Sequence, residues 1–166
     1  MSDEIAECRS AAVPPPIVVG VDGSESSVDA LRWAIDHAWL LESSVEAVTV
    51  WNQAETIGLS LGGAAVPSDL TAGIAVAERL LEDSIAATGC GQADSVRRRV
   101  VQGDPARTLR EASETARLLV VGNGGHGVAT RLFGGSVSQS CIRHARCPVL
   151  VFPQVVSRRQ DAVYVN

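Results

Sequence analysis

The sequence contains no lysine: all 14 of its basic residues are arginine. A phosphate-binding loop of the G-x-x-x-x-G-K-[ST] kind is therefore excluded, as is catalysis through a lysine Schiff base or a lysine general base. The formal net charge of −5 also disfavours a general DNA- or RNA-binding protein, which would carry a basic surface.

Long apolar runs and paired cysteines are also missing. No apolar run approaches the ~18 residues of a membrane-spanning helix, and the opening residues MSDEIAECRS lack the basic and apolar regions of a secretory signal. The 4 cysteines form no C-x-x-C pair, which disfavours a disulfide framework or a zinc site. We therefore expect a cytoplasmic protein without membrane contact, in which Cys141 is a core residue.

Short apolar runs alternate with amphipathic segments along most of the chain. Strands are predicted at 17–22, 45–51, 96–102, 118–122 and 148–152. Helices are predicted at 24–38, where Ser24 or Ser26 can cap the first turn, at 69–88, from Pro105 onward, and at 136–145. The helix at 69–88 has one apolar face, formed by Leu70, Ile74, Ala77, Leu81 and Ile85. Five strands alternating with four helices predict an α/β fold: a single doubly wound, Rossmann-like domain with a mostly parallel sheet.

The remaining segments divide the chain into a flexible N-terminal segment (1–16), one domain (17–153) and a C-terminal tail (154–166). Residues 52–68 form a long loop inside the domain, and such loops are usually lids or disordered. The arginines at 97–99 are typical of a strand at the edge of a sheet, although a phosphate-binding role for them stays open.

The ends of the first and fourth strands carry the residues that indicate a ligand site. The first strand runs into Asp22, and the fourth runs into a glycine-rich segment, 122–135. Ligands of open α/β sheets bind beyond the carboxyl ends of the strands where the strand order reverses. Glycine lets backbone N–H groups approach an anion, and the N-terminus of the helix at Ser136 favours a phosphate. This pattern predicts a polyphosphate cradle that needs no lysine.

The spacing Gly122, two residues, Gly125, nine residues, Gly135-Ser136 resembles the G-x2-G-x9-G-[S/T] signature of the universal stress protein family. The segments IVVGVDGSESS (17–27), VQGDP (101–105) and RHARCPVLVF (143–152) resemble further family segments. The resemblance implies the adenine nucleotide alpha hydrolase-like form of the Rossmann-like fold. It also implies that ATP is bound, since members with this glycine pattern bind it.

By this resemblance, Asp22 would contact the nucleoside and Val50 would lie against the adenine. Gly122 and Gly125 would approach the ribose and phosphates, and Gly135 and Ser136 would hold the distal phosphates. Further candidates flank these positions: Val21, Gly103, Asn123, His126, Val137 and Ser138. Mg²⁺ would accompany the triphosphate, with Asp22 as a candidate contributor.

Each candidate also has a purely structural interpretation. Asp22 can begin a turn as an Asx residue, Val50 can be a core residue of its strand, and His126 can be a solvated loop residue. His126 stands where many relatives carry Arg or Lys, and Asn123 where they often carry Ser.

The leading hypothesis is an ATP-binding regulatory or stress-response protein. The resemblance implies a homodimer, since members of the family commonly pair through the last strand, here the apolar strand 148–152. An exposed sheet edge of that kind needs cover. The sequence shows no arrangement of nucleophile, base and orienting group, so we do not expect an enzyme beyond slow ATP hydrolysis. The alternatives are a module for cyclic AMP or another adenine nucleotide, an ATP-pyrophosphatase-type enzyme, and a structural dimer with an empty site. Gly122→Val or Gly135→Val is expected to abolish binding while leaving the circular dichroism unchanged.

Overall fold

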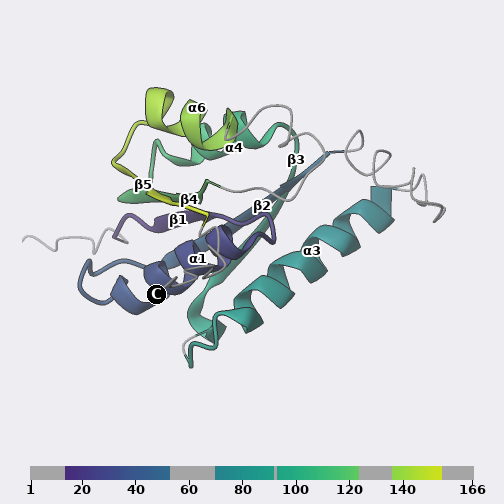
Figure 1. The fold of residues 1–166 in the computed structure, drawn as a ribbon, viewed down its shortest axis with the longest axis horizontal. Coiled ribbons are helices and arrows are strands. Elements are labelled where there is room, and N and C mark those ends of the chain that lie inside the picture. The colour runs from purple at the N-terminus through teal and green to yellow at the C-terminus, as the bar shows by residue number, and fades with distance from the viewer. Residues whose placement is uncertain (1–13, 53–69, 92, 124–135, 155–166) are drawn as a thin grey trace, which may run out of the picture.

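The structure, a computed structural model, describes residues 14–52, 70–91, 93–123 and 136–154. Within these residues the chain forms one sheet of five strands and four α-helices (Figure 1). The strands are β1 (Ile17–Gly20), β2 (Val45–Trp51), β3 (Arg97–Gln102), β4 (Leu118–Gly122) and β5 (Val149–Phe152). The α-helices are α1 (Glu25–His37), α3 (Leu70–Ala87), α4 (Pro105–Ala112) and α6 (Ser136–His144), and a short 3-10 helix, η2 (Ala93–Ser95), precedes β3.

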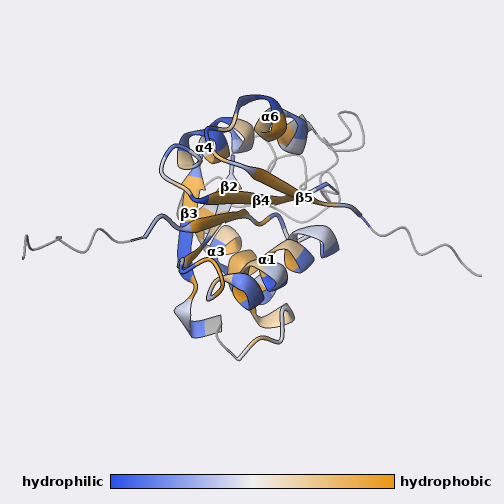
Figure 2. Ribbon diagram, turned by 90° about the vertical axis from the view of Figure 1, so that its left-hand side faces the viewer, coloured by the Kyte–Doolittle hydropathy of each residue, from blue (hydrophilic) through white to orange (hydrophobic). Residues whose placement is uncertain are grey.

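The strand order is β3-β2-β1-β4-β5, and each of these pairings is parallel. Helices α1 and α3 cover one face of the sheet, and α4 and α6 cover the other (Figures 1 and 2). The predicted α/β, doubly wound fold is therefore confirmed. β3 lies at one edge of the sheet, as its arginines predict, and β5 lies at the other.

Alternate residues of each central strand enter different core layers, because side chains of a strand point to opposite faces. Ile17 of β1 packs in the α1 and α3 layer with Leu81, whereas Val18 packs in the α4 and α6 layer with Leu109 and Cys141. Cys141 is fully buried, which confirms it as a core residue. Burial raises the pKa of its thiol to about 11, so Cys141 stays a neutral, poorly reactive thiol at neutral pH.

The ends of the helices follow the chemistry of their terminal residues. The Ser24 side chain caps α1 by accepting a hydrogen bond from the Ser27 N–H, and Asp104 caps α4 in front of Pro105. Beyond α3, Gly89 has a φ of +66°, which glycine adopts without strain. No helix in the described part of the chain is long and apolar enough to cross a membrane.

The buried face of α3 differs from the prediction at its first turns. The sequence places Ile74 on the buried stripe, but Ile74 is 41% exposed and Gly73 faces the sheet instead. A Cβ atom on Gly73 would lie 2.4 Å from the Trp51 ring, so only glycine lets α3 approach this indole. The prediction for Ile74 is wrong because the size of Trp51, and not the apolar pattern alone, sets the rotation of the helix.

A carboxylate of the neighbouring strand β2 offsets part of the positive charge of the edge strand β3. Glu46 of β2, with a side chain only 11% exposed, lies 3.6 Å from Arg97 and 3.3 Å from Arg99 between charged atoms. Arg97 and Arg99 therefore already have a carboxylate partner, which leaves less charge for the alternative of binding phosphate.

Replacing Glu46 with glutamine is expected to lower the free energy of unfolding by about 1–2 kcal/mol, since Arg99 loses a charged hydrogen bond and Arg97 loses its ion pair. Urea unfolding measures the change, which should shrink in high salt because both arginines are partly exposed. Glu111→Gln is the matched control: it removes the exposed Arg107–Glu111 pair and should change stability much less. Equal effects of the two substitutions would contradict the proposed importance of Glu46.

Candidate functional site

The order of the strands reverses between β1 and β4, and the carboxyl ends of these two strands form what we call the switch point. From β1 the chain adds β2 and then β3 on one side, and later adds β4 and β5 on the other. The register pairs Gly20 of β1 with Val121 of β4, so Val21 and Gly122 follow at neighbouring strand ends. The structure thus brings the Asp22 turn and the end of β4 together at the switch point, where ligands of such sheets bind.

Asp22 lies two residues beyond the end of the first strand. Strand β1 ends at Gly20, although the Val21 N–H still donates to the Val48 carbonyl at 2.9 Å. The Asp22 side chain is exposed, and its Oδ1 accepts hydrogen bonds from the Ser24 N–H at 3.0 Å and from Ser24 Oγ at 2.6 Å. Gly23 between them has a φ of +81°. Asp22 therefore begins an Asx turn, and the turn presents its carboxylate at the surface of the switch point.

Gly122 packs directly against the first turn of α1. A Cβ atom at this position would lie 2.6 Å from Ser26 Oγ and 2.8 Å from the Ser27 backbone nitrogen. Real Cβ atoms do not approach other atoms so closely, so the end of β4 needs glycine to pack here. A Gly122→Val chain should therefore not keep its native packing, contrary to the expectation from the sequence that its circular dichroism would be unchanged.

Asn123 and Ser138 join the end of β4 to α6. The Asn123 N–H donates to the Phe152 carbonyl at 2.7 Å, and Asn123 Oδ1 accepts a hydrogen bond from Ser138 Oγ at 2.9 Å. Val137 is partly buried against the α4 and α6 core layer. These three flanking candidates thus place the N-terminus of α6 beside the switch point, and each has a structural contact of its own.

Val50 and Gly103 lie on the β2 side of the switch point. Val50 is partly buried and packs in the α4 and α6 layer, while Thr49 beside it donates a hydrogen bond from Oγ1 to the Val21 carbonyl at 3.1 Å. The Gly103 N–H donates to the Trp51 carbonyl at 3.0 Å. Val50 is therefore close in the sheet to the Asp22 turn, whereas Gly103 lies farther out, beyond the end of β3.

Gly125, His126 and Gly135 lie outside the described residues, as does the side chain of Ser136, whose backbone begins α6. Residues 53–68 of the predicted loop and the predicted tail from residue 155 also lie outside them.

The sequence indicates Ser24 or Ser26 only as the cap of the first helix and gives Ser27 no role. All three are buried at the switch point, between Asp22 and Gly122. The signal that indicates them is the spacing of serines in DGSESS directly after a buried strand, where the first turn of a helix faces the ligand side of the sheet.

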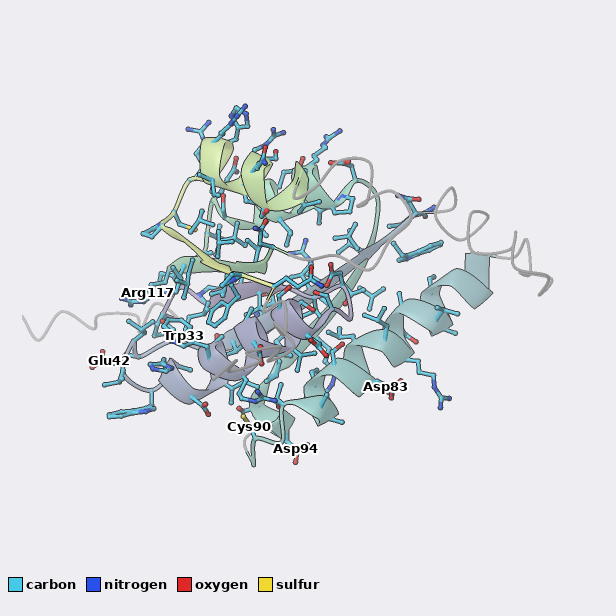
Figure 3. The ribbon with its side chains drawn as sticks, viewed as in Figure 1. Trp33, Glu42, Asp83, Cys90, Asp94 and Arg117 are labelled. Carbon is cyan, nitrogen blue, oxygen red and sulfur yellow. The ribbon has the colours of Figure 1, made fainter. Side chains whose placement is uncertain are left out.

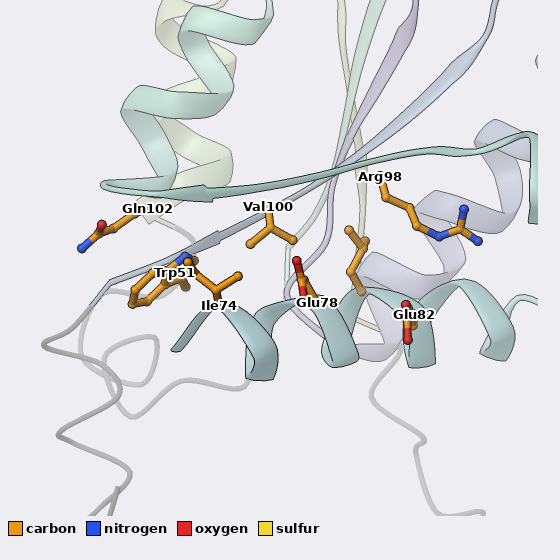
Figure 4. A pocket seen from close by; sticks show the side chains of 8 residues that line it. Trp51, Ile74, Glu78, Glu82, Arg98, Val100 and Gln102 are labelled. Carbon is orange, nitrogen blue, oxygen red and sulfur yellow. The ribbon is translucent and has the colours of Figure 1, made fainter. Parts of the chain in front are cut away.

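A concavity lies between α3 and the edge strand β3, with a volume of about 350 Å³ (Figure 4). Its lining residues are Trp51, Ile74, Glu78, Leu81, Glu82, Arg98, Val100 and Gln102. It contains none of the candidate residues from the sequence, and its two carboxylates, Glu78 and Glu82, would repel a polyphosphate. Arg98 is the single basic residue of this lining, so the pocket is an unfavourable place for a polyphosphate.

The described residues contain no group of three or more His, Cys, Asp or Glu side chains placed to hold a metal ion. A Mg²⁺ ion bound mainly through nucleotide phosphates needs only one or two carboxylates. Asp22, an exposed carboxylate at the switch point, fits that requirement.

The chain has the framework of a nucleotide-binding α/β domain. This framework consists of a doubly wound sheet, a carboxylate after the first strand and a glycine at the end of the fourth. Comparison with known proteins defines the class further. The model of the universal stress protein family matches residues 15–153, and the chain belongs to this family.

The relatives agree with this assignment. Universal stress protein Rv2005c of Mycobacterium tuberculosis is 38% identical over 141 residues, which cover 84% of this chain and 45% of that protein. The chain thus spans about half the length of the curated relatives it matches. Among solved structures, universal stress protein UspA from Lactobacillus plantarum has a TM-score of 0.62 at 23% identity, over 85% of this chain and 99% of its own. A universal stress protein solved in complex with cAMP has a TM-score of 0.55 at 28% identity, over 85% and 98% of the two chains.

Proposed function

We propose that this protein binds an adenine nucleotide at the switch point between β1 and β4. The observation that carries the proposal is the junction of the exposed Asp22 carboxylate with the first turn of α1 and the close-packed Gly122 backbone. A carboxylate accepts hydrogen bonds from ribose hydroxyls or an adenine amine, and a helix N-terminus attracts phosphate. The family and the cAMP complex of a similar protein support an adenine nucleotide.

ATP with Mg²⁺ is the ligand that we propose. The glycine signature at Gly122, Gly125 and Gly135-Ser136 supplies backbone N–H groups for a triphosphate. With no lysine in the chain, these donors, the α6 N-terminus and the metal would balance the phosphate charge. The same absence favours holding ATP over cleaving it rapidly, and we propose at most slow hydrolysis.

Cyclic AMP is the second candidate, since a similar structure was solved with it. One experiment tests both. Protein purified from cells is denatured, and the released ligand is identified by mass spectrometry, followed by calorimetric titration of the emptied protein with ATP and with cAMP. We expect ATP to be released and to bind more tightly. Released cAMP, or tighter binding of cAMP, would favour the second candidate, and no binding of either at millimolar concentration would contradict the proposal.

We further propose that the protein acts in the cytoplasm as a regulatory homodimer in the stress response, with nucleotide occupancy changing the dimer and its partners. The support for pairing is β5 (Val149–Phe152), an edge strand whose residues are all partly exposed. Trp33 of α1, labelled in Figure 3, packs beside Phe152 at the end of this strand, with ring centroids 6.2 Å apart. Sedimentation equilibrium at micromolar concentration tests the dimer, and a monomer with and without nucleotide would contradict it.

A further inference from the structure

Three serines at the beginning of α1 are almost fully buried although serine is usually exposed. Ser24, Ser26 and Ser27 are 1%, 2% and 1% exposed. A buried hydroxyl without a partner is costly, and none of the buried side-chain polar atoms in the described residues lacks a hydrogen bond. These serines therefore form a specific network.

The network ends at the Asp22 carboxylate. Ser24 Oγ donates to Asp22 Oδ1 at 2.6 Å, a short hydrogen bond of the charge-assisted kind. The same Ser24 Oγ accepts from the Ser27 N–H at 3.2 Å and lies 3.2 Å from Ser26 Oγ. A serine hydroxyl can donate only one hydrogen bond, and Ser24 uses its hydroxyl hydrogen to bond the Asp22 carboxylate. Ser26 is therefore the donor in the hydrogen bond between the two hydroxyls.

The other end of the network touches β4. Ser26 Oγ lies 2.6 Å from the place where a Cβ of Gly122 would be, so this hydroxyl fills the space that the missing side chain leaves. Ser26 thus lies between the Gly122 backbone and Ser24, and Ser24 holds Asp22. The Ser26 and Ser24 side chains therefore connect the end of β4 with the Asp22 turn.

We propose that Ser24 and Ser26 are positioning residues for the nucleotide site: they hold the Asp22 carboxylate in one orientation relative to the Gly122 backbone. The Ser24 N–H also donates to this carboxylate oxygen, at 3.0 Å, but the Ser24 hydroxyl at 2.6 Å is the closer donor. Without the hydroxyl, the exposed aspartate moves more readily among its staggered rotamers. When Ser24 Oγ accepts a hydrogen bond from the Ser26 hydroxyl, its own hydroxyl is polarised, and its hydrogen bond to Asp22 becomes stronger. The effect on ligand affinity rests on the proposed adenine-nucleotide function, whereas the effect on the Asp22 side chain does not.

A double-mutant cycle tests whether the serines act through Asp22. With ATP as the calorimetric ligand, Ser24→Ala is expected to weaken binding about tenfold and Ser26→Ala about threefold. In an Asp22→Ala background neither serine substitution should weaken binding further. Additive losses in that background would mean that the serines support only the fold, and would overturn the proposal.

Two controls separate positioning from general stability. Ser24→Ala also removes the α1 cap, whereas Ser26→Ala keeps it. Ser84→Ala removes a buried hydroxyl of α3 that donates to the Leu80 carbonyl at 2.7 Å, and should lower stability without changing affinity. Ser24→Thr keeps the hydroxyl and is expected to restore much of the affinity lost in Ser24→Ala.

A ligand-free measurement keeps the test decisive if no nucleotide binds. Three-bond NMR couplings from the Asp22 carboxyl carbon to the backbone report its χ1 rotamer. We expect one rotamer in the unchanged protein and averaged couplings in Ser24→Ala. Averaged couplings in the unchanged protein would overturn the proposal even if ATP binds. A single rotamer lost in Ser24→Ala, with no nucleotide bound, would instead contradict the proposed function and leave the positioning role standing.

Discussion

Replacing Gly122 with alanine is expected to lower the free energy of unfolding by about 3 kcal/mol, at the upper end of the usual cost of overpacking. The added methyl group would lie 2.6 Å from Ser26 Oγ and 2.8 Å from the Ser27 nitrogen. A flexible side chain could turn aside, but the Ser27 nitrogen belongs to the backbone of α1. Either α1 or the end of β4 must therefore shift, and urea unfolding should show a lower midpoint with an unchanged slope.

Gly91→Ala is the matched control for this prediction. A Cβ atom on Gly91 meets nothing within 4 Å, so the same chemical change should leave stability nearly unchanged. Equal destabilisation by the two substitutions would indicate a general effect of losing glycine, and would contradict the close approach of β4 and α1. Because the shift at Gly122 displaces the first turn of α1, we also expect weaker nucleotide binding in Gly122→Ala than in Gly91→Ala.

The sequence was sufficient to predict the layers of this fold, because its strands are short apolar runs and its helix ends carry strong signals. The predicted ends of the strands differ from the structure by at most two residues, and two strands match at both ends. The differences have local causes: Pro148 has no N–H for the ladder, and the chain beyond Gly20 turns toward α1.

Contacts between distant segments could not be predicted in the same way. The apolar period of α3 places Ile74 inward, but the ring of Trp51 requires Gly73 there. Gly122 was recognised as part of a phosphate-binding pattern, while its contact with Ser26 depends on how two segments about a hundred residues apart pack together. Patterns along the chain specify which face of an element is apolar, and only the packed structure specifies which atoms meet.

The Asp22 carboxylate can begin the Asx turn, bind the nucleoside, or do both. The substitution Asp22→Asn separates these roles. Asparagine keeps an Oδ1 that can accept from the Ser24 N–H, so the Asx turn and the fold should survive. The negative charge and part of the acceptor capacity are lost. If Asp22 only begins the turn, ATP should bind as tightly as before, or more tightly, because a charge near the phosphates has been removed.

If Asp22 receives hydrogen bonds from the nucleoside, Asp22→Asn is expected to weaken ATP binding by about tenfold, the effect of losing one charged hydrogen bond. Calorimetry with ATP and with adenosine measures this, and adenosine should lose affinity by a similar factor because it lacks phosphates. A loss for ATP in Mg²⁺ with none for adenosine would place Asp22 at the metal instead. Glu25→Gln is the control, since it removes an exposed carboxylate from the first turn of α1 and should leave adenosine binding unchanged. The sign of the change thus decides the role of Asp22: a carboxylate that only shapes the turn repels the triphosphate, whereas one that holds the nucleoside is needed even when no phosphate is present.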